Sequence, residues 1–531
     1  MAFRYWVGGS GTWDSTNTAN WSATSGGAGG ASVPNSADNA IIDSASGAGT
    51  VTLGEDVTCV QLDIRTYTGT LDFNNKQINV AGNSLVVLRA DTGSTVTGNP
   101  VVNLTYAGST GTRTIGVGAV TEANSITVNV TAGSDIVTTS SASAVKTLNF
   151  TGFSGTLSNT AKTIYGNLII STGMTVTAGA NATTFAATSG TQQITTSGKT
   201  LDHPITQNNP GAILQLQDNL TMGSTRTFTL TAGTLDLVTR TLSTGIFGSS
   251  NSNVRSIAFG TGNITLTGNN ASILSFSTAT NLTITGTPIV NCTYSGATGT
   301  RQFNAGGVAN YASNNPKIAI NITAGTDIFT LAGANVFGNV NFTGFTGSYG
   351  FTAADPQLFG NLILGTGMTG PSSATRSLLF NAASGTQTIT TNGVTINSGI
   401  IVQGGSTCVF ADALTMGATN TFTITAGTVQ LKNGVTSTVG SFVANNSSVK
   451  FLQSTTPGSQ ATLSQASGTV NVVDLTIRDI NAVGGAAWNA YTDFENTDAG
   501  NNDGWNFSLS PPYSTAELPI TLRPFTQPRR F

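Results

Sequence analysis

Aspartates that recur at intervals of about twenty residues are the side chains of this sequence best suited to catalysis. Asp202, Asp218 and Asp236 form one such series. Hydrolysis of a glycosidic bond uses two carboxyl groups that lie about 5 Å or about 6.5–9.5 Å apart. Acids on neighbouring turns of a coiled chain could reach these separations, so the three aspartates are candidates for cleaving a polysaccharide.

Histidine and cysteine offer little further chemistry. His203 is the single histidine. A Ser-His-Asp site that used its neighbour Asp202 is disfavoured, because adjacent side chains of a strand point opposite ways. We therefore expect His203 in a surface loop. Cys59, Cys292 and Cys408 lie far apart and form no Cys-x-x-Cys motif, so we expect them to be small buried hydrophobic residues.

An acid-rich stretch near the end of the chain, DFENTDAGNNDGW, is the part of the sequence that most resembles a metal site. It carries Asp493, Glu495, Asp498 and Asp503. Oxygen ligands at alternate positions beside a glycine suit calcium, although the spacing differs from that of an EF-hand. We expect a solvated acidic turn and no cofactor, and keep calcium as the alternative.

Composition narrows the class of protein. Charged residues make up 8% of the chain, against roughly a quarter in ordinary proteins, and glycine is abundant. Many threonines and valines, interrupted by glycine and asparagine, favour strands joined by turns. The net charge of −3 gives no basic surface for nucleic acid. No apolar run is long enough for a membrane-spanning helix, and the opening residues lack the apolar core of a Sec signal peptide.

A long internal repeat organises the sequence. PVVNLTYAGSTGTR from Pro100 recurs as PIVNCTYSGATGTR from Pro288, and LTMGSTRTFTLTAGTLDL from Leu220 recurs as LTMGATNTFTITAGTVQL from Leu414. One block of about 190 residues is therefore present twice. Some acids repeat with it, as Asp218 does with Asp412.

Asp135 and Asp327 are a second pair of acids at equivalent positions of the two blocks. Acids that repeat in this way favour a turn role, in which the carboxylate binds local backbone. On this ground we expect no enzyme.

Within each block, short runs such as TFTLTAGTLDL alternate apolar with polar residues and end at glycine or asparagine. This texture is typical of short strands with one buried face. Two all-β architectures fit: a single elongated parallel β-helix, or a string of β-sandwiches. Few hairpin signals and no linkers occur, so we predict the β-helix, with about 18 to 20 turns and a length of about 90 Å at the usual spacing of strands.

The predicted domain boundaries follow from the repeat. We expect an N-terminal tryptophan-rich cap at 1–50, a β-helix at 51–475, a C-terminal cap at 476–509 and an extended arm at 510–531. The blocks within the β-helix run over 51–213, 214–408 and, in part, 409–475.

All five tryptophans lie outside the repeated region. An array of stacked strands exposes unpaired backbone at both ends and needs atypical terminal units. We therefore expect the tryptophan rings to cover these ends. Stacking of a sugar on an exposed ring is the alternative. The five are Trp6, Trp13, Trp21, Trp488 and Trp505.

The last residues form a proline-rich and arginine-rich segment that discourages regular strands. It could be a disordered tail, or an arm that orders on assembly and binds a neighbouring subunit or a particle. Its aromatic anchors and cations would be Arg523, Phe525, Arg529, Arg530 and Phe531.

Two motifs carry a resemblance. WVGGSGTWDSTNTANWS, followed by VPNSADNAIID, resembles the opening module of many bacterial and phage β-helical surface proteins, adhesins and virion fibres among them. The closing GGAAWNAYTDFENTDAGNNDGWNF is similar to the ending of long repetitive surface and phage proteins. The resemblance implies a location on a virion or cell surface and no particular activity.

These observations predict a non-enzymatic structural rod. We expect a phage virion fibre or appendage. Its expected partners are two further copies in a homotrimer, other virion proteins through the arm, and a host surface glycan. A tailspike-like polysaccharide depolymerase and a bacterial surface adhesin are the alternatives. We expect neither nucleic acid as a partner nor a membrane span.

Overall fold

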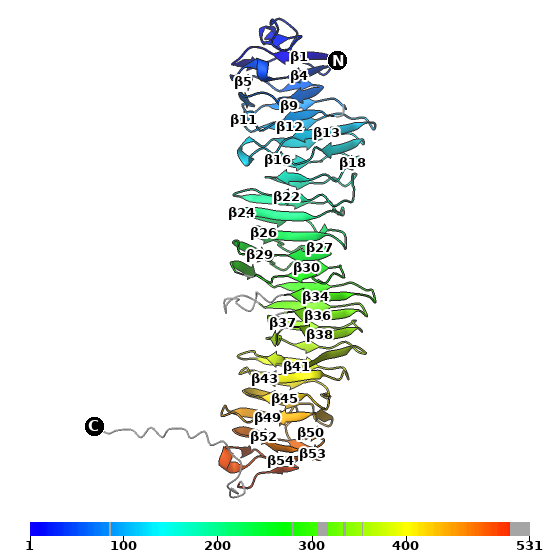
Figure 1. Ribbon diagram of the computed structural model, residues 1–531, viewed down its shortest axis with the longest axis vertical. Coiled ribbons are helices and arrows are strands. Elements are labelled where there is room, and N and C mark those ends of the chain that lie inside the picture. Colours follow the sequence, from blue (N-terminus) through cyan, green and yellow to red (C-terminus); the bar gives the residue numbers. More distant parts are fainter. Residues whose placement is uncertain (84–85, 279, 305–316, 333–335, 353, 510–531) are drawn as a thin grey trace, which may run out of the picture.

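The computed structural model describes residues 1–531 except 84–85, 279, 305–316, 333–335, 353 and 510–531. The described residues form one elongated stack of short strands with almost no helix, a parallel β-solenoid of about 20 turns (Figure 1). The predicted parallel β-helix is therefore confirmed, and the tandem β-sandwiches are wrong. The predicted arm at 510–531, with Arg523, Phe525, Arg529, Arg530 and Phe531, lies outside the described residues.

Each of the first turns contributes one strand to each of three sheets. One turn consists of β7 (Gln61–Asp63), β8 (Thr70–Asp72) and β9 (Gln77–Val80). The next consists of β10 (Leu88–Ala90), β11 (Thr95–Thr97) and β12 (Val101–Leu104), each parallel to its counterpart in the preceding turn. Three strands per turn give a three-sided coil that encloses a narrow core.

Two sheets near the N-terminal end and two near the C-terminal end contain fewer strands than the long sheet system described below. The nine-stranded sheet also contains β1 (Ala2–Trp6), β3 (Trp21–Ser22), β4 (Asp38–Ile41), β13 (Thr112–Val117), β15 (Ile136–Thr139), β18 (Thr156–Leu157) and β21 (Thr175–Val176). The four-stranded sheet adds β2 (Gly11–Trp13) and β5 (Thr50–Leu53). Two three-stranded sheets near the C-terminal end contain β47 (Thr436–Val439), β50 (Ala461–Gln465) and β53 (Ile480–Gly484), and β51 (Thr469–Asn471), β54 (Ala487–Asn489) and β56 (Trp505–Asn506).

The remaining strands form one long sheet system along the rod. Its strands are β6 (Val57–Cys59), β9, β12, β14 (Thr127–Val130), β16 (Ser143–Val145), β17 (Leu148–Asn149), β19 (Lys162–Ile164), β20 (Leu168–Ile169), β22 (Thr183–Phe185), β23 (Thr191–Thr195), β24 (Ile205–Leu216), β25 (Leu220–Thr221), β26 (Thr227–Asp236), β27 (Thr241–Thr244), β28 (Ile246–Gly248), β29 (Arg255–Ala258), β30 (Asn263–Leu266), β31 (Leu274–Ser275), β32 (Leu282–Thr285), β33 (Ile289–Cys292), β34 (Thr300–Asn304), β35 (Ile318–Ile322), β36 (Ile328–Ala332), β37 (Val336–Asn341), β38 (Ser348–Thr352), β39 (Gln357–Leu358), β40 (Leu362–Ile363), β41 (Thr369–Phe380), β42 (Thr386–Thr390), β43 (Asn397–Val402), β44 (Thr407–Phe410), β45 (Thr421–Ile424), β46 (Gly427–Leu431), β48 (Ser441–Val443), β49 (Lys450–Ser454), β52 (Leu475–Arg478) and β55 (Thr497–Asp498).

Short 3-10 turns are the helical elements of the described residues. They are η1 (Thr18–Asn20), η2 (Ser44–Ser46), η3 (Glu122–Asn124) and η5 (Thr492–Phe494). η3 lies in the connection between β13 and β14 and projects on the flank of the rod.

The core is a set of columns made by the inward residues of stacked strands. Val102 of β12 lies between Ile78 of β9 and Val128 of β14 in the register of the sheet. Burial alternates along these strands, so the polar residue between two apolar ones faces outward. This arrangement uses the period-two pattern of the sequence directly, because successive side chains of a strand point to opposite faces.

Asparagine side chains form a ladder beside this core. The Asn103 amide donates to Asn79 at 3.0 Å, and the Asn129 amide donates to Asn103 at 2.9 Å. The second block repeats the ladder, with Asn321 donating to Asn291 at 2.9 Å. Each rung joins one turn to the next, which stabilises the in-register stacking of the coils.

Two glycines at equivalent corners of the blocks are required by the backbone. Gly152 and Gly344 both have a φ of +94°. A Cβ on Gly152 would overlap the carbonyl oxygen of Thr131, and a Cβ on Gly344 would overlap that of Thr323. These carbonyl groups belong to the adjacent turn of the coil and cannot move independently of it.

We expect Gly152→Ala to lower the free energy of unfolding by about 2 kcal/mol, because a non-glycine residue at positive φ is strained and its methyl group meets backbone. Urea unfolding followed by circular dichroism measures the change. Gly93→Ala is the control: Gly93 is not at positive φ, and a Cβ there would make only an ordinary contact, 3.5 Å from the Tyr67 carbonyl oxygen, so this substitution should be neutral or slightly stabilising. Equal effects of the two substitutions would contradict the expectation.

Candidate functional site

The three candidate catalytic aspartates are each engaged by the framework of the coil. The Asp202 carboxylate accepts from Arg226 Nε at 2.7 Å. Asp218 accepts from the backbone N–H of Thr196 at 2.8 Å, and Asp236 accepts from the Gln215 amide at 2.9 Å. Each of these bonds joins one turn to the next, so all three carboxylates act as links between coils.

The repeated acids divide into two structural roles. Asp412, the counterpart of Asp218, accepts from the backbone N–H of Thr391 at 2.9 Å, which matches the predicted backbone-binding role, although the backbone belongs to the neighbouring turn. The same prediction is wrong for Asp135 and Asp327. Both are buried in ion pairs, with Arg113 at 2.7 Å and Arg301 at 2.8 Å, and all four side chains are fully buried.

The prediction of a surface loop for His203 is wrong, because the imidazole lies in the core. Its exposed fraction is 2%, and its Nε2 lies 3.0 Å from the hydroxyl of Thr183 on the preceding turn. Nδ1 has no hydrogen-bond partner. A Ser-His-Asp triad needs a carboxylate at that nitrogen, so this ring is not set up as a general base.

Lys162 is buried beside His203 and was missed by the sequence analysis. Its Nζ donates to the carbonyl oxygen of Thr160 at 2.7 Å and lies 3.5 Å from the Thr183 hydroxyl. Burial lowers the pKa of Lys162 to about 8. Burial, and then the positive charge of Lys162, lower the pKa of His203 to about 4, against the opposing effect of Asp202.

These shifts predict an acid sensitivity centred on His203. Its folded-state pKa lies below its ordinary value of 6.5, so protons favour unfolding, and stability is lost as the pH falls from about 6.5 through 4. We expect this group to lower the free energy of unfolding by about 2 kcal/mol when the pH falls from 7 to 5. Lys162 stays protonated between pH 5 and pH 7, so it does not contribute to this change in the free energy of unfolding.

His203→Ser isolates this effect, since Ser398 occupies the equivalent buried position of the second block. Urea unfolding of the parent and the variant at pH 7 and pH 5 measures it. The parent should lose about 2 kcal/mol more than the variant. The same loss in both proteins would show that other groups cause the acid sensitivity.

The proposed calcium residues lie in the final turn. Asp498 accepts from the backbone N–H of Gly500 at 2.9 Å and from the Asn502 amide at 2.7 Å, and Asp503 accepts from Gln460 at 2.8 Å. Asp493 lies in η5 and Glu495 directly follows it. Within the described ranges, no group of three or more His, Cys, Asp and Glu side chains is arranged to hold a metal ion.

The tryptophans lie at the two ends of the rod. Trp21 packs edge to face against Trp6 and Trp13, with ring centroids 5.3 Å and 5.0 Å away, and all three are buried. Trp488 and Trp505 pack together at 5.0 Å at the other end. The N-terminal rings present no free face on which a sugar could stack.

The cysteines are buried, as predicted, and spread along the core. Burial raises the pKa of each thiol to about 12, so the reactive thiolate form is suppressed at neutral pH.

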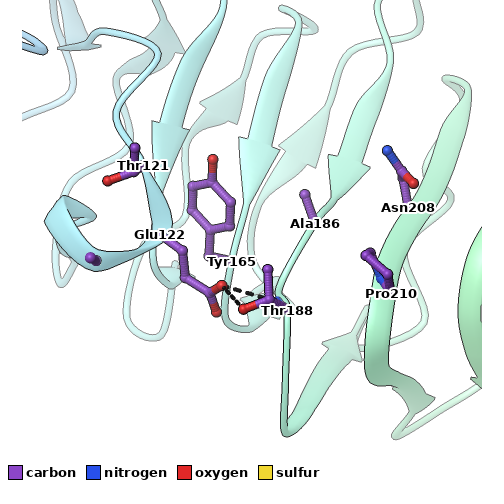
Figure 2. A pocket seen from close by; sticks show the side chains of 8 residues that line it. Thr121, Glu122, Tyr165, Ala186, Thr188, Asn208 and Pro210 are labelled. Atoms are coloured by element: carbon purple, nitrogen blue, oxygen red, sulfur yellow. Dashed lines mark hydrogen bonds between the residues drawn. The ribbon is translucent and has the colours of Figure 1, made fainter.

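An open groove lies on the flank of the rod, beneath the η3 connection, and encloses about 710 Å³ (Figure 2). Glu122 of η3 reaches across to the neighbouring coils, where its Oε2 accepts from the backbone N–H of Thr188 at 3.0 Å and from the Thr188 hydroxyl at 2.7 Å. The Tyr165 hydroxyl donates to the carbonyl oxygen of Val120 at 3.1 Å. The lining residues are Thr121, Glu122, Ala123, Tyr165, Ala186, Thr188, Asn208 and Pro210.

Sequence reasoning missed this groove because its residues come from separate turns. Glu122 and Thr188 are 66 positions apart, and neither belongs to a recognisable motif. The one available signal was the departure from the repeat, since Thr188 stands where the second block has Ala383.

Comparison of the chain with protein-family models, curated proteins and solved structures finds no match. In the part of the chain that the structure describes, no helix is long and apolar enough to cross a membrane.

Proposed function

We propose that this chain is a non-enzymatic structural rod, a bacteriophage virion fibre or appendage that assembles as a homotrimer and contacts the host surface or its glycans. The observation that carries the proposal is the continuous β-solenoid, whose two ends are occupied by tryptophan clusters. Such a stack resists bending, because each coil in the interior of the described stack is hydrogen-bonded to the coils on both sides.

The use of the acids supports a structural role over a depolymerase. Asp202 is paired with Arg226, while Asp218 and Asp236 bind groups of adjacent turns. A general acid or nucleophile must be free to reach a substrate, and these carboxylates already serve the framework. The proposed arm would bind other virion proteins, which places attachment at the C-terminal end.

Gold-antibody labelling of a lysate of the source organism, viewed by electron microscopy, tests the location. The fibre proposal expects label on phage particles and thin rods about 95 Å long, given about 20 turns at the spacing of β-strands. Label confined to bacterial envelopes would overturn it in favour of a surface adhesin. Light scattering on the purified protein should give three times the chain mass of 53.9 kDa, and a monomer would contradict the trimer.

A further inference from the structure

We propose that the groove beneath η3 binds a neutral saccharide, an assignment that rests on the proposed surface-contacting role of the rod. The groove combines an aromatic ring and a proline with hydroxyl, amide and carboxylate groups (Figure 2). A pyranose has an apolar C–H face and a rim of hydroxyl groups. Binding sites for such ligands pair apolar surface with a few placed polar groups.

The aromatic part of the groove is held in one position. The Tyr165 hydroxyl donates to the Val120 carbonyl oxygen, and the ring is only partly buried between η3 and Ala186, which directly follows β22. Pro210 adds a second rigid, exposed apolar ring on the opposite side of the groove. Rings that are fixed before binding lose little conformational entropy when a sugar packs on them.

The polar part is also fixed before binding. Glu122 Oε2 is held by two bonds from Thr188, which orients the carboxylate and leaves its other oxygen to accept from a hydroxyl group. Asn208 is exposed at the far side and offers both an amide donor and an acceptor. Acceptors and donors on two sides suit a hydroxyl-rich ligand.

The charge of the groove selects against acidic sugars. Glu122 is the one ionisable carboxyl group among the lining residues, and none of them is a lysine or an arginine. A uronic acid, sialic acid or phosphate would meet a fixed negative charge with no cation to offset it. The net charge of the chain, −3, has the same sign.

The second block shows that the fold does not require these residues. Tyr165 aligns with Phe359 and Thr188 aligns with Ala383, so the hydroxyl groups that secure the groove are absent there. The two hydroxyl groups are therefore particular to the first block, where they bind Val120 and Glu122 of the η3 connection and fix the shape of the groove.

Binding of the full chain to a printed array of neutral and acidic oligosaccharides tests the inference. The neutral set contains glucose, galactose, mannose and N-acetylhexosamine oligomers, and the acidic set contains uronic and sialic acids. We expect binding to one or more neutral oligomers and none to the acidic set. Binding restricted to acidic sugars, or to no sugar, would overturn the inference.

Calorimetry with the best neutral oligomer then places the site. Tyr165→Ala should weaken binding at least tenfold, and Asn208→Ala, at an exposed position that leaves the coil intact, should weaken it several-fold. Tyr165→Phe keeps the ring and should bind nearly as the parent does. Phe359→Ala is the matched control in the second block and should change nothing. Unchanged binding by both Tyr165→Ala and Asn208→Ala would refute the groove.

Failure of this inference can be told apart from failure of the proposed function. A chain that labels phage particles but binds no neutral oligomer remains a fibre without this site. If the chain binds a neutral oligomer through Tyr165 but antibody against it labels no particle, the saccharide site is supported and the fibre proposal is wrong.

Discussion

Asp135→Ala is expected to destabilise the first block by about 3–5 kcal/mol, because it removes one partner of a fully buried ion pair. The carboxylate of Asp135 receives two bonds from Arg113, at 2.9 Å from Nε and 2.7 Å from Nη2, and neither side chain is exposed. Removing it leaves a guanidinium group in the core without a counter-charge. Arginine cannot lose its proton to relieve this cost.

The surroundings of Arg113 do not replace the lost carboxylate. The guanidinium lies 5.6 Å from the ring centroid of Tyr106 and 5.5 Å from that of Phe153, and it also donates to the carbonyl oxygen of Ala132 at 2.9 Å. Cation–π contacts and a carbonyl acceptor lower the energy of the cation, but they carry no net negative charge. Asp135→Asn, which keeps the shape, should therefore recover only part of the loss.

The second block supplies the control for this experiment inside the same molecule. Arg301 pairs with Asp327 at 2.8 Å between the rings of Tyr294 and Phe345. Stability in a solenoid is largely local, because each coil contacts only its neighbours. In Asp135→Ala, hydrogen exchange should therefore accelerate around 104–137 and stay unchanged in 292–304 and 317–329.

A second control separates burial from charge. The pair of Asp202 and Arg226 has a similar distance, 2.7 Å, but its side chains are 37% and 22% exposed. Exposed pairs contribute about 0–1 kcal/mol. If Asp135→Ala cost no more than Asp202→Ala, the argument from burial would be wrong.

The fold could be predicted from the sequence because a solenoid uses one local rule many times. Alternation of apolar and polar residues sets which side chains face inward, and the repeat of about 190 residues shows that the rule continues along the chain. Alternation alone also fits tandem β-sandwiches, and the scarcity of hairpin signals and linkers between the strands distinguished the parallel stack of about 20 turns.

The wrong predictions arose where residue type was allowed to override alternation. His203 and Asp135 both occupy inward positions of alternating runs, with Leu201 and Ile205 buried on either side of the histidine and Val137 buried two positions after the aspartate. Their polarity suggested turns and surface. In a narrow core, a polar group can still be buried if a group on the next coil offers a partner, as Thr183 does for His203 and Asp135 does for Arg113.

The groove could not have been predicted in this way, because its formation depends on an irregular connection. Glu122 reaches Thr188 only because η3 folds along the flank of the rod across intervening coils. Neither alternation nor the spacing of the turns determines the path of such a connection.

Trp21→Ala is expected to lower the free energy of unfolding by about 3–5 kcal/mol and to uncover the N-terminal end of the rod. The Trp21 ring is the centre of the N-terminal cluster, since it packs against both Trp6 and Trp13 and is 1% exposed. It lies on β3, which is antiparallel to β1, with Trp6 opposite Trp21. Removing the ring leaves a cavity between β1 and β2 that the short strands cannot close.

The consequence extends beyond stability, because this cluster covers the end of a stack of parallel strands. An uncovered end presents unpaired backbone groups that can bind another chain. Trp21→Ala should therefore show faster proteolysis within 1–50 and a mass in light scattering that rises with protein concentration. Phe3→Ala, on the same terminal unit but with a ring 52% exposed, should show neither change. If residues 1–50 of Trp21→Ala stay protected from proteolysis, the pairing of β1 with β4 closes the end without the ring, and the expectation is wrong. If protection is lost only within 1–50, the cap folds as a unit on an otherwise intact coil.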